Sequence, residues 1–217
     1  MPKRLILVAG NIGSGKTSLT EKIGQRLGWQ TAYESVVDNP YLPNFYADMK
    51  TWSFHLQVYF LGHRAQQHLD MWNLSQSAII DRSIYEDAHI FARALHQMGN
   101  LTELDYLSYL KLFNILTQGL PKPSMLIYLK APVKVLMKRI QQRARNMETG
   151  ITPDYLELLD SYYNEWIRSF DLCPVLTIST DDLDFVHKSK HLDVVIQRIQ
   201  SMFAVKEEVN FSNQNDL

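Results

Sequence analysis

An apolar run near the middle of the chain ends in a cluster of charged side chains. In the stretch AIIDRSIYEDAHIF (78–91), Asp81, Arg82, Glu86 and Asp87 fall within seven positions. The apolar residues before them predict a short buried strand. Acidic and basic side chains therefore lie together at the end of a predicted strand, which predicts a functional site at that point.

The clearest motif lies near the N-terminus, where GNIGSGKTS (10–18) fits the P-loop pattern G-x-x-x-x-G-K-[ST]. Glycines permit backbone conformations in which successive N–H groups surround phosphates, and the next helix points its positive end at them. A lysine adds charge, and a threonine hydroxyl can bind Mg²⁺. The motif predicts binding of a nucleoside triphosphate by Gly10, Asn11, Gly13, Ser14, Gly15, Lys16, Thr17 and Ser18.

Two GTPase motifs are missing from the sequence, and their absence narrows the class of reaction. A switch GTPase needs glycine after its metal-binding Asp and an Asn-Lys-x-Asp base motif, but Asp81 is followed by Arg-Ser-Ile and the chain contains no Asn-Lys. A small-molecule kinase needs instead an acceptor pocket, a general base and positive charge on a closing lid. The remaining motifs fit these needs.

Two spacings predict the acceptor pocket. Gln57 and Arg64 are seven residues apart in an aromatic-rich segment, so they share one helix face and can read the edge of a flat heterocycle. Asp87 and Phe91 are four apart on another predicted helix, and Asp87 can meet Arg64 if the two helices flank one pocket. There is an alternative for each pattern. The first segment is then an ordinary amphipathic surface helix with aromatic core residues, and Asp87 is an exposed acid on a surface helix.

A basic segment, KRIQQRARNMETGIT (138–152), carries Arg139, Arg143 and Arg145. Arginines at the end of a helix predict a lid that neutralises the transferring phosphoryl group. A solvated basic helix face is the alternative.

These residues must be positioned by alternating strands and helices. Short apolar runs predict five strands at 4–9, 31–34, 78–81, 125–129 and 175–179. Longer periodic segments predict helices at 16–27, 52–72, 85–97, 103–118, 133–145, 153–170 and 192–203. Gly28 and Thr102 are the expected end of the first helix and start of the fourth. The alternation predicts an α/β fold with an open, parallel sheet.

Composition agrees with one enzyme-sized domain. The chain has 217 residues, is 46% hydrophobic and carries a formal net charge of −1, so nothing global indicates nucleic-acid binding. A single cysteine, Cys173, fits a reducing compartment, and no apolar run approaches a membrane span. We therefore expect a cytoplasmic protein with one domain over residues 1–205 and a frayed tail over 206–217.

Together these motifs resemble the deoxyribonucleoside kinase family over about residues 3–185. GNIGSGKTS resembles its P-loop, DRSIYED its Asp/Glu-Arg-Ser motif, RIQQRARNMETGI its arginine lid and STDDLDF its donor-adenine loop. The segment YESVVDNPYLPNFYADMKTWSFHLQVYFLGHRAQ resembles the part that carries the catalytic Glu and the base-reading Gln. The resemblance implies a P-loop kinase-like five-stranded parallel sheet with helices on both faces and an arginine lid.

The resemblance also implies roles for individual residues. Glu34 is the general base for the 5′-hydroxyl, and Arg82 holds that base and the reacting phosphate. Thr17 and Asp81 position Mg²⁺, while ATP is the phosphate donor. The implied substrate contacts are Tyr46, Trp52, Gln57, Arg64, Asp87, Phe91 and Glu148. The implied donor-adenine loop comprises Asp181, Asp182 and Leu183, the lid comprises Arg139, Arg143 and Arg145, and Glu86 receives no role.

Two departures from the animal members resemble the bacterial deoxyadenosine/deoxyguanosine kinase branch. Asp81 stands where many animal members have Glu, and ESVVDNPYL places a longer spacer after Glu34. The charged pair Arg64 and Asp87 suits purines or cytosine better than thymine. The resemblance further implies a homodimer packed through the helices predicted at 52–72 and 103–118. A nucleoside monophosphate kinase, such as a thymidylate kinase, and a non-catalytic nucleotide-binding protein are the alternatives.

Overall fold

The computed structural model describes residues 2–33, 39–143, 150–181, 183, 185 and 188–204. These residues contain one five-stranded sheet in the order β2-β3-β1-β4-β5, with every neighbouring pair parallel. The strands are β1 (Leu5–Gly10), β2 (Gln30–Ala32), β3 (Ala78–Asp81), β4 (Met125–Lys130) and β5 (Val175–Ser179). The parallel α/β sheet predicted from the sequence is confirmed.

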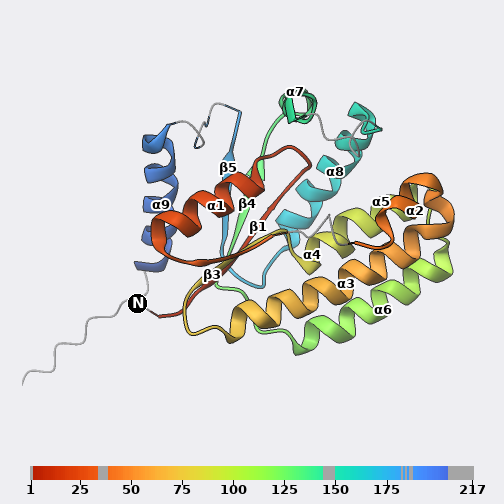
Figure 1. Cartoon of the computed structure of the whole chain (residues 1–217), viewed down its shortest axis with the longest axis horizontal. Helices are drawn as coiled ribbons and strands as arrows, with labels where there is room; N and C mark the ends of the chain where they lie inside the picture. Colours follow the sequence, from red (N-terminus) through yellow and green to blue (C-terminus); the bar gives the residue numbers. More distant parts are fainter. Residues whose placement is uncertain are drawn as a thin grey trace, which may run out of the picture.

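Helices cover both faces of the sheet (Figure 1). Along β1, Leu5 and Leu7 face one core while Ile6 and Val8 face the other. The first core is covered by α3 (Met49–Asn73), α6 (Glu103–Gly119) and α8 (Pro153–Ser169), and the second by α1 (Lys16–Leu27) and α9 (Ser189–Ala204). Burial on both sides explains why the strands are continuously apolar.

The shorter helices lie between these larger elements in the chain order. They are α2 (Leu42–Ala47), α4 (Ile84–Glu86), the π-helix η1 (Asp87–Ala92), α5 (Arg93–Gln97) and α7 (Val133–Arg143). Helix α1 ends at Gly28 in the left-handed conformation, and the Thr102 hydroxyl caps α6 by accepting the Asp105 N–H at 3.1 Å. Both predicted helix boundaries are confirmed.

The structure departs from the helix predictions most clearly at 85–97 and at 42–47. The segment predicted as one α-helix at 85–97 contains a π-helix between two short α-helices, since its backbone bonds run to the fifth residue instead of the fourth. Helix α2 was not predicted because it spans only six residues, too few to display an apolar period. Its first turn contains Pro43, at a position where proline is well tolerated.

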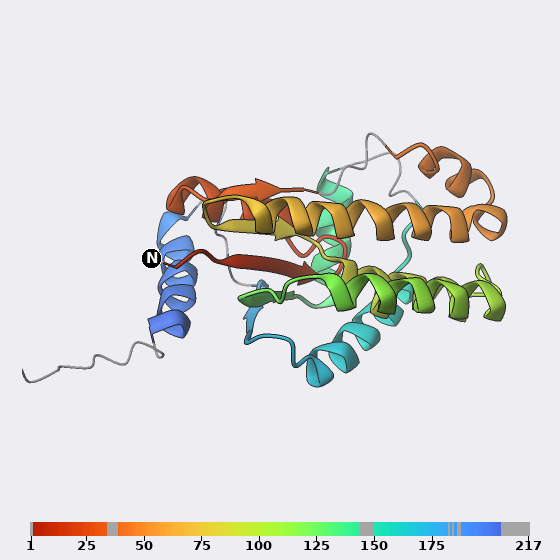
Figure 2. The same cartoon turned by 90° about the horizontal axis from the view of Figure 1, so that it is seen from below.

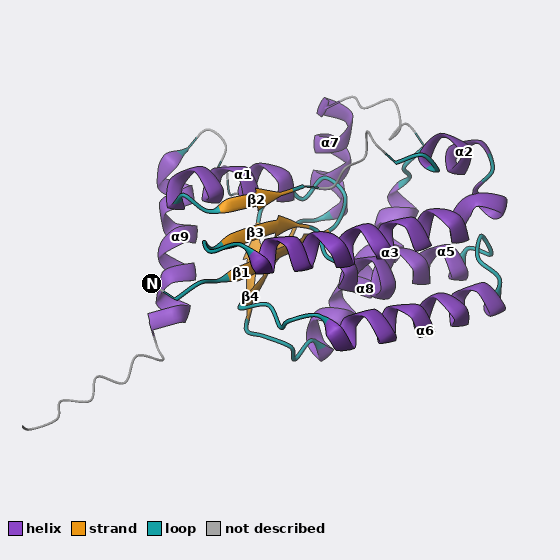
Figure 3. Ribbon diagram, turned by 60° about the horizontal axis from the view of Figure 1, so that its bottom comes forward, coloured by secondary structure: helices purple, strands orange, loops and turns teal. Residues whose placement is uncertain are grey.

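Helices α3 and α6 lie alongside each other and reach beyond the sheet (Figures 2 and 3). Within the described ranges, no helix combines the length and apolarity that crossing a membrane requires. The expected tail at 206–217 lies outside the described residues.

Candidate active site

The phosphate loop joins β1 to α1 and has the backbone that its glycines permit. Gly10, Gly13 and Gly15 have φ angles of 151°, 83° and 97°. Helix α1 begins without a side-chain cap, so its first N–H groups remain for an anionic ligand. A Cβ on Gly13 would lie 3.0 Å from the Leu136 carbonyl oxygen of α7, which shows how closely that helix packs on the loop.

Neighbouring elements hold the loop in place. The Asn11 amide donates to the Leu156 carbonyl of α8 at 2.9 Å, so this predicted phosphate-binding side chain supports the loop. The Lys16 ammonium donates to the carbonyls of Gly10 at 2.7 Å and Asn11 at 3.1 Å. Phe185 lies over Gly15, 3.1 Å from where a Cβ would stand. Ser14 is buried and Ser18 is half-buried.

An acid and a hydroxyl meet at the ends of two neighbouring strands. The parallel register pairs Val8 with Asp81, which brings the Asp81 carboxylate beside the start of α1. The Thr17 hydroxyl donates to this carboxylate at 2.5 Å. Two hard oxygen donors thus converge next to the phosphate loop, as a magnesium site requires.

Arg82 follows Asp81 in a strained conformation. Its φ of 71° is positive, the only such value among the described non-glycine residues. A non-glycine residue held in this region costs roughly 1–3 kcal/mol, and such strain is concentrated at functional sites. The Arg82 N–H donates to the Val8 carbonyl, and the guanidinium lies 4.3 Å from the Phe91 ring centroid. The backbone turn therefore directs this buried cation between the phosphate loop and η1.

Glu86 connects the charged cluster to the phosphate loop, so the expectation that it has no part in the site is wrong. Its carboxylate is fully buried and accepts hydrogen bonds from the Gly10 N–H at 3.2 Å, the Ser83 N–H at 3.1 Å and the Tyr163 hydroxyl at 2.7 Å. Arg82 lies 3.7 Å away. The spacing of Ser83 and Glu86 is that of a capping box, a signal already visible in the sequence.

Two of the predicted acceptor residues, Gln57 and Arg64, lie on the buried face of α3. Arg64 and Asp87 form an ion pair whose side chains are only 2% and 4% exposed. Gln57 is also buried, and its Oε1 has no hydrogen-bond partner within the described part of the chain. Burial, and next the Asp87 charge, raise the pKa of Tyr109 well above its ordinary value, which places this α6 residue beside the pair. A buried amide acceptor without a partner indicates a ligand position.

Aromatic residues gather on α2, just before it and at the start of α3. Trp52 is half-buried and lies 6.0 Å from the Tyr41 ring and 5.2 Å from His55. Tyr46 is 46% exposed and contacts Phe45 edge-on. The sequence did not single out Tyr155 of α8. Burial raises its pKa to about 12, and the smaller effects of Arg82, which lowers the pKa, and Tyr46 show that Tyr155 lies near both residues.

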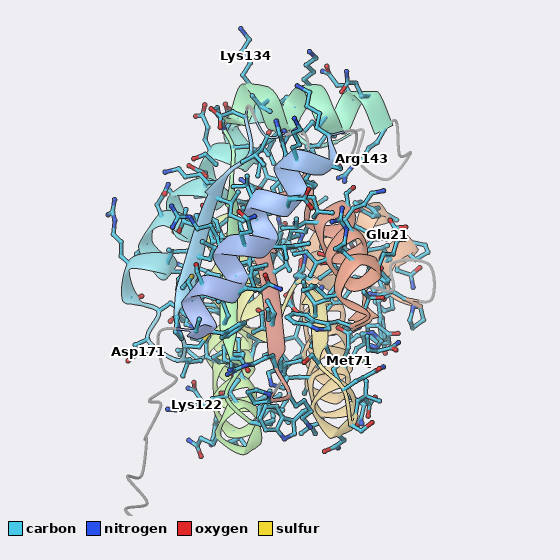
Figure 4. The ribbon with its side chains drawn as sticks, turned by 90° about the vertical axis from the view of Figure 1, so that its left-hand side faces the viewer. Glu21, Met71, Lys122, Lys134, Arg143 and Asp171 are labelled. Atoms are coloured by element: carbon cyan, nitrogen blue, oxygen red, sulfur yellow. The ribbon has the colours of Figure 1, made fainter. Side chains whose placement is uncertain are left out.

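Helix α7 carries the described part of the predicted lid. Arg139 donates to the Thr180 hydroxyl at 3.0 Å and to the Thr180 carbonyl, which ties α7 to the residue after β5. The Thr180 hydroxyl in turn reaches the Ser14 carbonyl at 3.4 Å. Arg143 is exposed at the end of α7 (Figure 4). Arginine thus approaches the phosphate loop from the side of α7.

The remaining predicted residues divide into two groups. Asp181 is exposed, and Leu183 packs against the core under α1 and α9. Four others lie outside the described residues: Glu34, Arg145, Glu148 and Asp182.

A phosphate loop, an acid–hydroxyl pair and buried cations at the ends of parallel strands define a P-loop phosphotransferase. The family model for deoxynucleoside kinases matches residues 6–204. The chain belongs to the deoxynucleoside kinase family. It is therefore a kinase, and a nucleotide is its phosphate donor. This agrees with the main prediction and not with its two alternatives.

Known relatives cover nearly the whole chain. A deoxyadenosine/deoxycytidine kinase of Bacillus subtilis is 38% identical over 205 residues, which is 93% of this chain and 94% of the relative. A deoxyguanosine kinase of the same organism is 35% identical, with 91% and 96% covered. The structure of deoxyadenosine kinase from M. mycoides with bound dATP superposes with a TM-score of 0.78 at 27% identity, covering 91% of this chain and 99% of that one.

Proposed function

We propose that the chain transfers the γ-phosphate of ATP to the 5′-hydroxyl of a deoxynucleoside for nucleotide salvage. Deoxyadenosine and deoxyguanosine are the favoured acceptors, and deoxycytidine is a further one. The supporting observation is that η1 connects the phosphate loop to the buried face of α3. Gly10 is hydrogen-bonded to Glu86, which lies near Arg82, and Arg82 lies over the Phe91 ring of η1. On the same helix, Asp87 pairs with Arg64 of α3.

The base preference follows from the polar groups on that face. The Gln57 Oε1 has no hydrogen-bond partner among the described residues and can accept from an exocyclic amino group, which adenine and cytosine carry and thymine lacks. Arg64 donates and Asp87 accepts, so the pair offers complementary groups to the edge of a base. Trp52 and Phe91 supply aromatic surface for the faces of the ring. The curated relatives are named for deoxyadenosine, deoxycytidine and deoxyguanosine, which supports the same preference.

The chemistry needs a base and much positive charge. Glu34 would accept the proton of the 5′-hydroxyl, and Arg82 would hold both that carboxylate and the reacting phosphate. Lys16 and the lid arginines would neutralise charge that develops on the transferring group. Tyr46 and Glu148 would bind the 3′-hydroxyl, and the loop with Asp181, Asp182 and Leu183 would hold the adenine of ATP.

Thr17 and Asp81 would hold Mg²⁺. The Thr17 hydroxyl oxygen and the Asp81 carboxylate oxygen lie 2.5 Å apart, and both kinds of oxygen are ligands that Mg²⁺ accepts. The described residues contain no group of three or more His, Cys, Asp or Glu that would hold a metal without help. Phosphate oxygens and water would complete the coordination, as is usual for Mg²⁺. When bound, the ion neutralises charge on the phosphates.

Turnover of the four natural deoxynucleosides with ATP tests the proposal. We expect the highest kcat/KM for deoxyadenosine or deoxyguanosine, a lower value for deoxycytidine and the lowest for thymidine. Turnover of dTMP without turnover of any deoxynucleoside would overturn the proposal, because it indicates a monophosphate kinase.

The general base is tested by Glu34→Gln, which keeps the size of the side chain and removes its basicity. Loss of the base should lower kcat by about a hundredfold or more. Glu21→Gln is the matched control, since Glu21 lies on the outer side of α1 (Figure 4). Near wild-type phosphoryl transfer by the Glu34 variant would exclude this assignment.

We also propose a homodimer packed through α3 and α6. The outer side of α6 presents five large apolar side chains that are 37–75% exposed: Leu104, Leu107, Leu112, Ile115 and Leu116. Apolar side chains gathered on one helix are typical of an interface. Sedimentation should give a dimer for the wild type and a monomer for Ile115→Glu. Val194→Glu on α9, which is exposed by 57%, should remain dimeric. A monomeric wild type at micromolar concentration would contradict the dimer.

We place the protein in the cytoplasm. Its single cysteine, Cys173, is half-buried, and burial raises the pKa of the thiol to about 12, so it is a poor nucleophile. Fractionation of the source cells, with the protein detected by antibody, tests this location. Recovery in a membrane or secreted fraction would exclude it.

A further inference from the structure

The carbonyl of Gly10 is shared by two donors. The Lys16 ammonium donates to it at 2.7 Å, and the Tyr163 hydroxyl of α8 lies 2.9 Å from it. The same hydroxyl lies 2.7 Å from the Glu86 carboxylate. A phenol has one proton, so Tyr163 can donate fully to only one of these two acceptors at a time.

The position of the Lys16 ammonium determines whether the Gly10 carbonyl has a second donor or depends on Tyr163. While the ammonium lies on Gly10, the carbonyl has a donor and Tyr163 is available to Glu86. The lysine of a P-loop reaches toward the β- and γ-phosphates when a nucleotide binds. Its departure would remove one donor from the carbonyl of a buried residue, a loss that is unfavourable unless another donor replaces it.

Glu86 can release the hydroxyl without losing all its partners. Its carboxylate still accepts from the Gly10 and Ser83 N–H groups and still lies near Arg82. The hydroxyl itself remains a donor, because burial and the Glu86 charge raise the pKa of Tyr163 well above its ordinary value. Stacking on Tyr128, with ring centroids 5.7 Å apart, holds the ring while its proton turns from one acceptor to the other.

We propose that Tyr163 is a positioning residue for nucleotide binding, whose hydroxyl moves from Glu86 to the Gly10 carbonyl when Lys16 moves to the phosphates. The exchange keeps the first peptide of the phosphate loop hydrogen-bonded in both states. The inference rests on the proposed binding of a nucleoside triphosphate by this loop.

Tyr163→Phe removes the hydroxyl and keeps the ring. We expect KM for ATP to rise about tenfold, with kcat and KM for the deoxynucleoside within about twofold of wild type. The nucleotide-free protein should melt at a moderately lower temperature, because the buried Glu86 carboxylate loses one donor, and the rise in melting temperature caused by ATP should also shrink. A purely structural role predicts the lower melting temperature with an unchanged ATP-induced rise and an unchanged KM for ATP. Tyr162→Phe, next to it on α8, is the matched control.

Equal ATP affinity of Tyr163→Phe and wild type would overturn the inference, whereas a wild type that neither binds nor consumes ATP would overturn the proposed function itself. A crystal structure of the wild type with a non-hydrolysable ATP analogue tests the exchange without a variant. The expected result is Lys16 on phosphate, with the distance from Tyr163 Oη to Gly10 O below 2.9 Å and that to Glu86 longer than 2.7 Å. Unchanged distances with Lys16 on phosphate would contradict it.

Discussion

The buried ion pair between Arg64 and Asp87 allows a quantitative test of the acceptor side. Their side chains are 2% and 4% exposed, so water cannot replace a lost partner. Removing one member of such a pair costs about 3–5 kcal/mol, because the other charge stays buried without its counterion. For a chain of this length that loss lowers the melting temperature by roughly 6–20 °C.

Four proteins complete a double-mutant cycle: the wild type, Arg64→Met, Asp87→Leu and the double variant. Replacing both charges by apolar groups of similar volume is often neutral or stabilising. We expect each single variant to be strongly destabilised and the double variant to melt close to wild type, which gives a coupling energy of several kcal/mol. Thermal and urea unfolding of the nucleotide-free proteins provide the measurement.

The same proteins test whether the pair reads the base. The double variant should fold but lose preference, with the ratio of kcat/KM for deoxyadenosine to that for thymidine falling about tenfold or more. Breaking the exposed pair of Arg93 and Glu165, whose side chains are 36% and 63% exposed, is the control and should change little. A double variant as unstable as the singles would refute the energetic argument. Unchanged base preference would refute the assignment to the base.

Gly13→Ala should raise KM for ATP more than about tenfold, because a Cβ would lie 3.0 Å from the Leu136 carbonyl at a φ of 83°. The control Gly62→Ala has open space and should stabilise the protein by about 0.4–1 kcal/mol. Asp81→Asn should raise the Mg²⁺ concentration for half-maximal rate about tenfold, and an unchanged Mg²⁺ dependence would exclude Asp81 from the metal site. Burial lowers the pKa of His68 below its ordinary 6.5. The folded protein therefore keeps the full contribution of neutral His68 above pH 6.5 and loses it as the pH falls below that value. In His68→Gln, the free energy of unfolding should fall less steeply between about pH 7 and about pH 5. Equal slopes for variant and wild type would contradict this.

Local patterns were sufficient for much of the fold and part of the site. The strands were predictable because a parallel sheet covered on both faces requires continuous apolar runs. The phosphate loop was predictable because glycine, lysine and threonine at fixed spacing satisfy one local backbone geometry. The ion pair of Arg64 and Asp87 could be predicted as a hypothesis, because a buried acid needs a cation as partner. The sequence did not show whether the two helices that carry these residues pack together.

Other features gave weak signals or none. The π-helix that carries Asp87 and Phe91 has the same apolar pattern as an α-helix would have. Tyr163 looks like any aromatic residue on the buried side of an amphipathic helix. The capping-box spacing of Ser83 and Glu86 was visible, but it predicts a helix start and not a contact with the phosphate loop.

The sequence by itself determined the order of strands and helices, the phosphate loop and the class of reaction, because these depend on residue types at short spacing. Only the tertiary structure decided that Glu86 belongs to the phosphate loop. Its contact with Gly10 joins residues 76 apart, and Tyr163 reaches Gly10 across 153 residues. Such contacts arise from the packing of α4 and α8 against the end of β1, and no local pattern records which helix faces will meet there.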